Sequence, residues 1–501
     1  MRLRDLLSGV GRFAGDEIPD VRVNAIRADS QEVGGGDLFV AIEGAQHDGH
    51  DFLGEVERRG AVAAVVERRP ADAGTLPVLV VDDSRAALAE LAAAWHGCPA
   101  ESMTLVGITG TVGKTSVLTI LERIMKRAGT PIGAIGSLGI HLGERTLAET
   151  GFTAPDALVL QEKLAELRDA GCRLLAMEVT SHALSQHRVR GLVFQLGIFT
   201  NLLPLEHRDY HGSFEEYVEA KLRFFDHLAP GVPVIYNADD PAVDSIVAGR
   251  DVVPVGVGRR QGAAVRIEDA RISASGTRLR LRIEGGIRQI DGTALGALDI
   301  PLDLKLLGWS NIYNAATAVA IGLVLGAGPA AVQAAVHELP PPRRRVEIIH
   351  SGRFTVVDDT AGHPDSVNAL FEAVDALDPG ALHAVFAVRG SRGPEINRHT
   401  AEAFATWARR RRVRTLAVTR SAEVVDNRNV VSEEELEAFL EPLRKAGLAY
   451  EQHERLDTAI RAVMPEAGDG DVVLLLGAQG MDAGAERVKE WLREDTVPTP
   501  P

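Results

Sequence analysis

The spacing of apolar residues changes from segment to segment along this chain. Residues 104–109 form a short apolar run, and Val117, Leu121 and Ile124 after it repeat at the spacing of one helical face. The same order of apolar run and amphipathic stretch returns many times up to about residue 490. Strands that alternate with helices form parallel sheets, so the pattern predicts an α/β fold.

Residues 252–304 depart from this pattern, because polar and apolar positions alternate there between glycine turns and predict a β-rich insertion. The predicted strands are 37–42, 61–66, 77–81, 104–109, 173–179, 196–200, 232–236, 354–357, 383–388, 415–419 and 471–476. The predicted helices are 85–96, 115–127 and 157–170.

Two breaks in the pattern are typical of linkers, Gly97-Cys98-Pro99 and Pro340-Pro341-Pro342. The 501 residues are also too many for one hydrophobic core. We therefore predict three domains, at 1–99, 100–341 and 342–501. The last resembles a Rossmann unit but lacks the Gly-x-Gly-x-x-Gly fingerprint, so it predicts no dinucleotide.

Composition narrows the function classes. A net charge of −16 argues against general binding of nucleic acid, although a local basic pocket for a polyanionic substrate remains compatible with it. Cys98 and Cys172 are too few for a disulfide framework and are expected to be buried small apolar side chains. No apolar run suggests a signal peptide or a membrane span, so we expect a cytoplasmic enzyme without a membrane partner.

The turn after residues 104–109 predicts a site for a nucleoside triphosphate. Its glycines allow a tight turn with amides directed at phosphate oxygens, and the following helix adds its dipole. Lys114 can reach the outer phosphates, and the Thr115 hydroxyl can ligate Mg²⁺. The spacing differs from the common P-loop, whose first glycine would stand at Ile108. The expected ATP-binding residues of this turn are Gly110, Thr111, Gly113, Lys114, Thr115 and Ser116.

Three further features suggest chemistry. Glu178 ends the run 173–179 beside the predicted phosphate site, where it could ligate Mg²⁺; the simpler alternative is a surface carboxylate. A polar cluster at 206–212 contains His207, which could bind a second metal or order the phosphate site. Lys221 lies in an amphipathic stretch whose pattern alone indicates a solvent-facing helix lysine.

Taken together, these motifs resemble the Mur ligases, and among them the MurE type, which adds an amino acid to UDP-N-acetylmuramoyl-L-alanyl-D-glutamate. The resemblance spans nearly the whole chain. The segments that carry it are Ala28-Asp29-Ser30, 36–41, 48–52, 107–116, Thr153-Ala-Pro-Asp156, 178–189, Asn201 with 207–212, Asn237-Ala-Asp-Asp-Pro241, Leu307-Gly308, Asn311-Ile-Tyr-Asn314 and Arg345-Val-Glu347.

The resemblance implies a three-domain Mur ligase architecture, with a central P-loop parallel-sheet ATPase domain and a C-terminal Rossmann-like domain. It implies ATP and Mg²⁺ as cofactors, a UDP-N-acetylmuramoyl peptide and an amino acid as partners, and a monomer. The resemblance also implies roles for single residues. Metal ligands would be Thr115, Glu178 and His207, and catalytic residues would be Lys114, His207 and a carbamylated Lys221. Further ATP contacts would come from Asn311, Arg345 and Asp359, and substrate contacts from Ser30, Thr153, Ala154, Thr180, Gln186 and Arg188.

The implied reaction makes an amide in peptidoglycan precursor synthesis. ATP would convert a carboxylate to an acyl phosphate, which the amine then attacks with loss of phosphate. Phosphoryl transfer of this kind depends on positioning and charge neutralisation. Domain closure would exclude the water that otherwise hydrolyses the acyl phosphate.

The chain departs from the family mainly towards its C-terminal end. Val112 replaces a usual asparagine, and Glu206 replaces an aspartate. Three acceptor-side motifs are altered, at Asp359-Thr-Ala-Gly-His-Pro-Asp365, at Arg420-Ser-Ala-Glu-Val424 in place of Asp-Asn-Pro-Arg, and at Gly477-Ala-Gln-Gly-Met-Asp482. Two alternatives to the leading hypothesis follow, a Mur-like ligase with another acceptor or carboxylate, and a pseudoenzyme that binds nucleotide without turnover.

Overall fold

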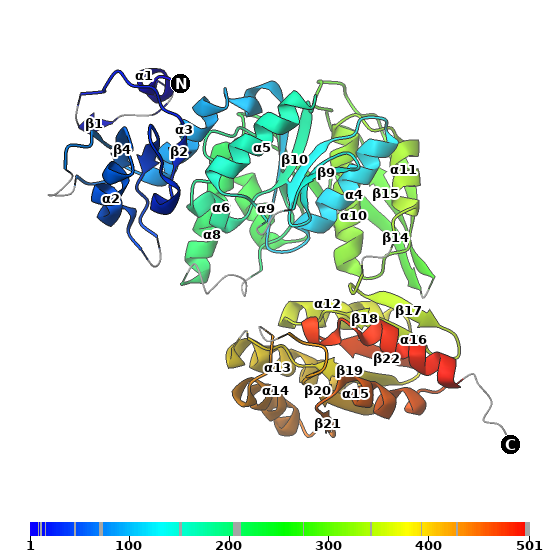
Figure 1. The fold of residues 1–501 in the computed structure, drawn as a ribbon. Helices are drawn as coiled ribbons and strands as arrows, with labels where there is room; N and C mark the ends of the chain where they lie inside the picture. Colours follow the sequence, from blue (N-terminus) through cyan, green and yellow to red (C-terminus); the bar gives the residue numbers. More distant parts are fainter. Residues whose placement is uncertain are drawn as a thin grey trace. The chain divides into compact units, whose positions relative to one another are not determined.

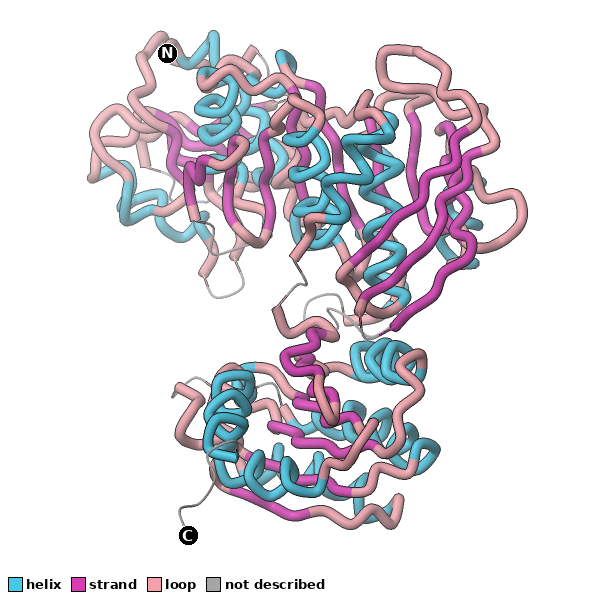
Figure 2. Tube along the Cα trace, turned by 90° about the vertical axis from the view of Figure 1, so that its right-hand side faces the viewer, coloured by secondary structure: helices cyan, strands magenta, loops and turns pink. Residues whose placement is uncertain are grey.

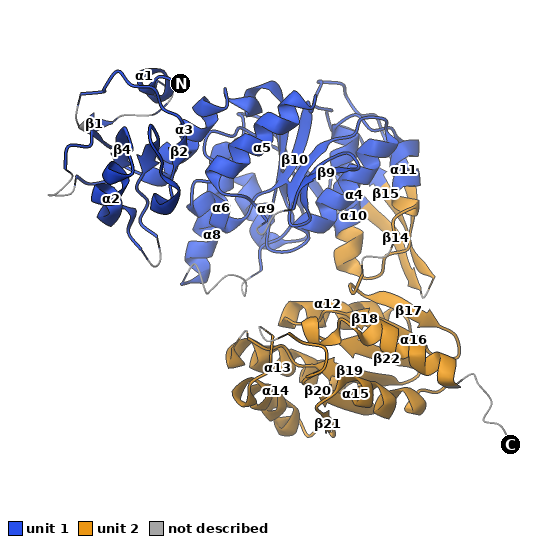
Figure 3. Ribbon diagram, viewed as in Figure 1, with its two compact units in different colours: residues 1–266, 282–299, 314–335 blue, residues 267–281, 300–313, 336–501 orange. Residues whose placement is uncertain are grey.

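The chain divides into two compact units, which are coloured separately in Figure 3. One unit comprises residues 1–266, 282–299 and 314–335, and the other comprises 267–281, 300–313 and 336–501. The computed structural model describes residues 1–8, 10, 13–15, 17–44, 47–69, 74–149, 153–203, 212–273, 275–340, 343–391, 393–426 and 429–495.

The N-terminal part is a five-stranded sheet with the order β1-β5-β4-β3-β2, parallel except for β1 (Figure 1). Apolar side chains cover both faces of its strands and form two core clusters. Its elements are α1 (Leu3–Leu7), β1 (Ala14–Gly15), β2 (Ile26–Arg27), β3 (Leu38–Val40), α2 (Leu53–Arg58), β4 (Ala63–Val66), β5 (Val78–Val80) and α3 (Ser84–Trp95).

The central part is an eleven-stranded sheet with the order β16-β15-β14-β13-β12-β11-β6-β10-β7-β8-β9. Its strands run side by side, with helices packed along them (Figure 2). The strands are β6 (Thr104–Thr109), β7 (Gly133–Gly136), β8 (Gly139–Leu142), β9 (Arg145–Ala148), β10 (Leu174–Glu178), β11 (Leu196–Phe199), β12 (Pro233–Asn237), β13 (Val253–Gly258), β14 (Val265–Ser273), β15 (Gly276–Ile283) and β16 (Leu298–Leu304). The helices are α4 (Lys114–Arg127), α5 (Ala157–Asp169), α6 (Ser181–Ser185), α8 (Phe214–Leu222), α9 (Pro241–Ala248), α10 (Trp309–Val324) and α11 (Pro329–His337).

Strands β10, β6, β11 and β12 pair in parallel, so their carboxyl ends meet at one edge of this sheet. Helix α4 follows β6 and buries the face that its sequence predicted, with Val117, Leu121 and Ile124 in the core. The parallel α/β prediction is thus confirmed for β6, β7 and β10–β13, whereas β8 and β9 are antiparallel. The predicted β-rich insertion is confirmed as strands, but β14–β16 extend the central sheet.

The C-terminal part is a six-stranded sheet with the order β17-β18-β22-β19-β20-β21, in which only β17 runs antiparallel to its neighbour. Alternate residues of each strand enter different cores, as Val357 and Phe386 do on one face and Val356 and Val385 on the other. The elements are β17 (Glu347–Ser351), β18 (Thr355–Asp359), α12 (Pro364–Asp375), β19 (Leu382–Ala387), α13 (Pro394–Arg411), β20 (Thr415–Thr419), α14 (Glu433–Lys445), β21 (Glu451–His453), α15 (Leu456–Val463), β22 (Val472–Leu476) and α16 (Gly484–Asp495).

The differences from the sequence expectations are instructive. The antiparallel strands β7, β8 and β9 and the edge strands β17 and β21 are absent from the predicted set, because all five are short and all but β7 carry polar residues. Both cysteines are free, and Cys172 is buried as expected, whereas Cys98 is only half-buried. The three sheets use strands from 14–80, 104–304 and 347–476, and the domain boundaries at 99 and 341 stay predictions.

The packing around β6 yields a stability prediction. A Cβ atom on Gly107 would stand 2.7 Å from a ring carbon of Phe224 and 3.0 Å from one of Phe194, both fully buried. Gly107→Ala should therefore lower the free energy of unfolding by about 1–3 kcal/mol through overpacking. Gly296→Ala, with nothing within 4 Å of its Cβ, should change it by less than about 0.5 kcal/mol. Equal urea midpoints for the two variants would contradict this packing.

Candidate active site

The loop between β6 and α4 has a backbone that only glycine can adopt at two positions. Gly110 has φ +133° and Gly113 has φ +90°. A Cβ at these positions would lie 2.0 Å from the Thr200 hydroxyl and 2.4 Å from the Asn314 amide oxygen. With glycine at both positions, the loop can turn tightly into α4. Its backbone N–H groups then lie at the first turn of this helix, where they and the helix dipole favour an anion. The predicted phosphate-binding turn fits a triphosphate.

Residues at the end of β11 hold this loop. The Thr200 hydroxyl donates to the Val112 carbonyl over 2.7 Å, and the Asn201 amide both donates to that carbonyl and accepts from the Val112 N–H, each over 3.0 Å. The Val112 side chain itself is 42% exposed. The backbone bonds explain how the loop can keep its shape although valine has replaced asparagine. Thr200 and Asn201 are thus functional positions that the sequence pattern gave no reason to single out for the loop.

Two lysines converge on the same loop carbonyl. Lys114 Nζ donates to the carbonyls of Gly110 and Thr111, and Lys221 Nζ donates to that of Gly110, all over 2.8 Å. Lys221 is 1% exposed, and its ammonium group stands 4.9 Å from the ring centre of Tyr217. The interpretation of Lys221 as a solvent-facing lysine is therefore wrong. Its own helix gave no sign of burial, because the burying surface is the loop that begins 111 residues earlier.

Glu178 lies at the carboxyl end of β10, next to the P-loop strand and in register with Ile108. Its carboxylate accepts from the Thr115 hydroxyl at 3.0 Å and from the Ser137 N–H at 2.9 Å. The side chain is 1% exposed, and burial raises the pKa of this carboxyl above its usual value. The alternative of a surface carboxylate is wrong.

A hydroxyl and a carboxylate in contact at the foot of the phosphate loop are oxygen ligands that suit Mg²⁺. In the described ranges, no group of three or more His, Cys, Asp or Glu side chains is arranged to hold a metal. Thr115 and Glu178 would therefore hold Mg²⁺ together with phosphate oxygens and water, which is the usual way this ion is bound. His207 lies outside the described residues.

The predicted substrate contacts form a second group. The Arg188 guanidinium donates to the Ala154 carbonyl over 2.7 Å and grips the Gln186 amide oxygen through two nitrogens, at 2.6 and 3.0 Å. Thr180 instead caps helix α6, since its hydroxyl accepts from the Ala183 N–H. The hydroxyl of Thr153 lies 3.0 Å from that of Ser137.

Gln186 and Arg188 face a cleft of about 720 Å³ that the N-terminal sheet also helps to line. Arg27, Asp29 and Trp95 come from that side, and Asp29 directly precedes Ser30. The cleft combines guanidinium groups with an indole ring, a combination that can take a phosphorylated, ring-bearing ligand.

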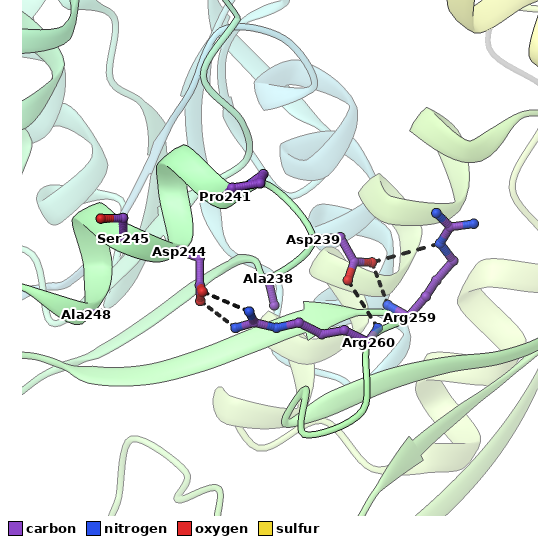
Figure 4. A pocket seen from close by; sticks show the side chains of 8 residues that line it. All are labelled: Ala238, Asp239, Pro241, Asp244, Ser245, Ala248, Arg259 and Arg260. Carbon is purple, nitrogen blue, oxygen red and sulfur yellow. Dashed lines mark hydrogen bonds and ion pairs between the residues drawn. The ribbon is translucent and has the colours of Figure 1, made fainter.

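A second cleft, of about 680 Å³, is lined by residues that follow β12 and β13 in the chain (Figure 4). Its charges are paired with one another. Asp239 accepts from the backbone N–H groups of Arg259 and Arg260, while Asp244 holds the Arg260 guanidinium over 2.5–2.8 Å. These pairs brace α9 against β13, so the segment Asn237-Ala-Asp-Asp-Pro241 has a structural part to play in this chain.

The remaining expected ATP contacts belong to the second unit. Asp359 is buried, which raises its pKa, and its carboxylate accepts from the N–H groups of Val346 and Ala361 at 2.8 and 2.7 Å. Arg345 donates to the Thr360 hydroxyl over 2.7 Å. Asn311 donates to the Leu307 carbonyl one helical turn earlier. Asp359 thus ends β18, and Arg345, which precedes the neighbouring strand β17, bonds to the residue that follows Asp359.

Arg344, which the sequence analysis passed over, is the more deeply buried of the two neighbouring arginines. Its guanidinium lies 3.2 Å from Asp358 and 2.9 Å from the Ala478 carbonyl, and it also contacts the Gly477 carbonyl and Asp482. It therefore ties β18 to the segment 477–482, one of the three altered motifs. A run of three arginines gives no signal as to which one turns inward.

The two other altered motifs are also engaged in structure. His363 caps α12, since its Nδ1 accepts from the Asp365 N–H at 3.3 Å. Arg420, which follows β20, pairs with Glu433 at 2.6 Å and with Glu454 at 3.6 Å.

Family models match most of the chain. They are Mur ligase family, catalytic domain, over residues 22–96, Mur ligase middle domain over 108–322, and Mur ligase, glutamate ligase domain, over 344–479. A protein of Geobacillus kaustophilus (strain HTA426), named UDP-N-acetylmuramoyl-L-alanyl-D-glutamate--2,6-diaminopimelate ligase, is 33% identical over 491 residues, which are 95% of this chain and 94% of the relative. The chain belongs to the Mur ligase family. The resemblance drawn from its motifs is confirmed, and with it the assignment as an ATP-dependent ligase.

Other Mur ligases agree. The Aquifex aeolicus (strain VF5) protein of the same name is 34% identical over 75% of this chain and 73% of its own. A solved structure of a ligase of that name has a TM-score of 0.71 at 20% identity, and covers 99% of this chain and 100% of its own. MurF from Thermotoga maritima in complex with ADP has a TM-score of 0.57 at 20% identity, over 95% and 98%. The three-domain Mur ligase fold is confirmed.

The buried carboxyl of Asp358, beside Arg344, predicts how the stability of the fold depends on pH. Burial raises the pKa of Asp358 to about 6 from its ordinary 3.8, despite the nearby guanidinium. The folded chain then binds more protons than the unfolded chain between about pH 4 and 6. The stability that this group contributes is therefore present below pH 4 and is lost as the pH rises through 6, by about 3 kcal/mol at most.

The test compares Asp358→Asn with the wild type in urea unfolding from pH 4 to 7. The wild type should lose stability relative to the variant across this window. Asp469→Asn, which changes an exposed carboxylate in the same unit, is the matched control for the effect of an Asp→Asn change itself. A constant difference for Asp358→Asn would show that Asp358 titrates normally.

Proposed function

We propose that this chain joins an amino acid to the free carboxylate of UDP-N-acetylmuramoyl-L-alanyl-D-glutamate at the expense of ATP. The observation that carries the proposal is the convergence of Lys114, Lys221 and the pair Thr115–Glu178 on one phosphate loop. The relatives from Geobacillus kaustophilus and Aquifex aeolicus are named as ligases of this same substrate with 2,6-diaminopimelate, which supports the proposal. The reaction belongs to the synthesis of peptidoglycan precursors, in the cytoplasm.

The muramoyl-peptide would lie on the cleft that Gln186 and Arg188 face. Arg188 is oriented by Gln186 and the Ala154 carbonyl, so its guanidinium meets an anion without a large loss of side-chain freedom. Thr153 and Thr180 would contact the same substrate, and Ser30 its uridine end. The carboxylate would thus be brought towards the phosphate loop from the side of β10.

The phosphate loop would then act on charge. A carboxylate that attacks a phosphorus atom brings two anions together, and the barrier falls when fixed donors neutralise the transferring oxygens. Loop amides and Lys114 would supply these donors, and Mg²⁺ held by Thr115 and Glu178 would add positive charge between the phosphates. Ser116 and Asn311 would hold other parts of ATP, as would Arg345 and Asp359 from the second unit.

Lys221 would serve as a carbamate. A neutral amine adds to carbon dioxide and releases a proton, which replaces an ammonium by a carboxylate-like group. At 2.8 Å from the Gly110 carbonyl, such a group would reach the metal side of the loop, where His207 is also expected to act. The buried setting between Tyr217 and the loop limits exchange of the group with bulk water.

Two observations bear on the alternatives. The chain keeps the residues expected to perform phosphoryl transfer, which disfavours a pseudoenzyme. The altered segments are engaged in contacts of their own at Arg344–Asp482 and Arg420–Glu433, which favours an acceptor other than diaminopimelate. The cleft disfavours a ligase that acts on a different carboxylate. Its lining joins residues of the N-terminal part, where the uridine end would bind, to Gln186 and Arg188, which would hold the muramoyl-peptide.

One assay separates these possibilities. The protein is incubated with Mg-ATP and UDP-N-acetylmuramoyl-L-alanyl-D-glutamate, single amino acids including diaminopimelate and lysine are added, and phosphate release and product mass are measured. A product that requires an amino acid supports the proposal and identifies the acceptor. Turnover only with another carboxylate supports a paralogue. Nucleotide binding without phosphate release in any mixture supports a pseudoenzyme.

Lys114→Ala should reduce phosphate release by at least about 100-fold, because it removes a donor to the transferring phosphoryl group. Lys126→Ala, on the same helix but paired with the exposed Glu144, is the matched control and should keep nearly full activity. Activity within tenfold of wild type in Lys114→Ala would refute the assignment of the nucleotide site.

A further inference from the structure

The turn between β7 and β8 passes directly against the carboxylate of Glu178. Gly136 and Gly139 pair across the hairpin, which leaves Ser137 and Leu138 as a two-residue turn. A Cβ on Gly136 would stand 2.3 Å from Glu178 Oε1, so glycine lets the backbone approach that closely. The Ser137 N–H then donates to Oε1 over 2.9 Å.

The Ser137 hydroxyl lies between two groups with different expected roles. Its Oγ is 3.0 Å from the Thr153 hydroxyl, which is expected to contact the muramoyl-peptide, and 3.5 Å from Glu178 Oε2, which also accepts from Thr115. A hydroxyl carries one hydrogen. Ser137 can therefore donate to Thr153 or to Glu178 Oε2, but not to both at once.

The hydrogen positions define two states. When the Thr153 hydroxyl donates to Ser137, Ser137 donates to Glu178 Oε2. This hydrogen bond uses a lone pair that Oε2 could otherwise offer to a cation. When the Thr153 hydroxyl donates to a bound ligand, Ser137 turns its hydrogen to Thr153, and Oε2 is released for a cation. A change at the substrate contact thus reaches the metal carboxylate through one rotating hydroxyl.

The turn is fixed to the helix that begins the phosphate site. His141 Nε2 lies 3.0 Å from the Leu138 carbonyl, and its Nδ1 lies 3.6 Å from Glu122 of α4. Thr115, in the first turn of α4, contacts the same carboxylate from the other side. Both donors to Glu178 therefore belong to elements braced against each other, so a rotated hydroxyl changes hydrogen bonding without moving the backbone.

We propose that Ser137 is a positioning residue that couples occupation of the muramoyl-peptide site at Thr153 to the readiness of Glu178 to bind Mg²⁺. This inference rests on the proposed function, because it takes the ligand at Thr153 to be the muramoyl-peptide. Substrate and metal then strengthen each other's binding, as reciprocity requires. Nucleotide phosphates are consequently not activated fully before the acid that receives the phosphoryl group is present.

The test measures metal affinity as well as activity. Mn²⁺, which also prefers oxygen ligands, is titrated into the full-length protein with saturating ADP and followed by electron paramagnetic resonance. The titration is made with and without UDP-N-acetylmuramoyl-L-alanyl-D-glutamate. In the wild type the substrate should tighten Mn²⁺ binding about two- to tenfold, the range expected when one hydrogen bond is gained or lost.

Ser137→Ala should reduce that factor to about one, while Ser137→Thr, which keeps a hydroxyl, should restore it. Thr153→Val, at saturating substrate, should remove the factor from the other end of the relay without altering the turn. Ser102→Ala, which removes a hydroxyl that donates to the Pro99 carbonyl elsewhere in the same unit, should leave it unchanged. Without substrate, Ser137→Ala should bind Mn²⁺ about as tightly as the wild type does with substrate, because no hydroxyl then donates to Glu178 Oε2.

A role confined to stability would lower the melting temperature of Ser137→Ala but preserve the effect of substrate on Mn²⁺ affinity, and that result would overturn the inference. The same factor in Ser137→Ala or Thr153→Val as in wild type would do so as well. If the wild type turns over this substrate, such a result removes the coupling alone. If the wild type neither binds nor uses the substrate, the proposed function fails and the coupling fails with it.

Discussion

The carbonyl of Gly110 is the point on which this site depends, because two ammonium groups donate to it at 2.8 Å. Like charges so close repel each other, and one of them is almost fully buried. The carbonyls of Gly110 and Thr111 and the ring of Tyr217 offset part of that repulsion. An anion on the loop, or conversion of Lys221 to a carbamate, lowers the electrostatic cost. The arrangement is therefore tuned to negative charge before any reaction takes place.

Glu178 presents the complementary constraint. Burying a carboxylate is costly unless hydrogen bonds replace water, and here the Thr115 hydroxyl and the Ser137 amide do so. The raised pKa indicates that these bonds compensate burial incompletely. A divalent cation bound there would offset the remainder. Metal binding and the fold of the β7–β8 turn would then stabilise each other at the edge of one parallel sheet.

The sequence predicted the parts of this site that are local. A strand, two glycines, a lysine and a hydroxyl lie within a dozen residues, so a local pattern was enough to predict the phosphate loop although its glycine spacing is unusual. Lys221 shows where such reasoning ends, because the helical period reports the face of one helix and not which surface covers it. Ser137 and Arg344 act through partners 41 and 133 or more residues away, and no periodicity records such distances. The family motifs pointed to Lys221, whereas the contacts of Ser137 and Arg344 are visible only in the structure.

The phosphate loop and the C-terminal part, where most departures from the family pattern lie, are held in different ways. The phosphate loop fixes its backbone conformation, since Gly110 and Gly113 admit no Cβ, whereas the side chain between them has changed at Val112. The edge of the C-terminal sheet is held by replaceable side chains, with His363 as a helix cap and Arg344 as a clamp. Arg344 contacts both Asp358 and Asp482, so a single arginine side chain ties the altered segment 477–482 to β18. Substitutions at this edge can therefore occur while the strands and the phosphate loop stay as they are.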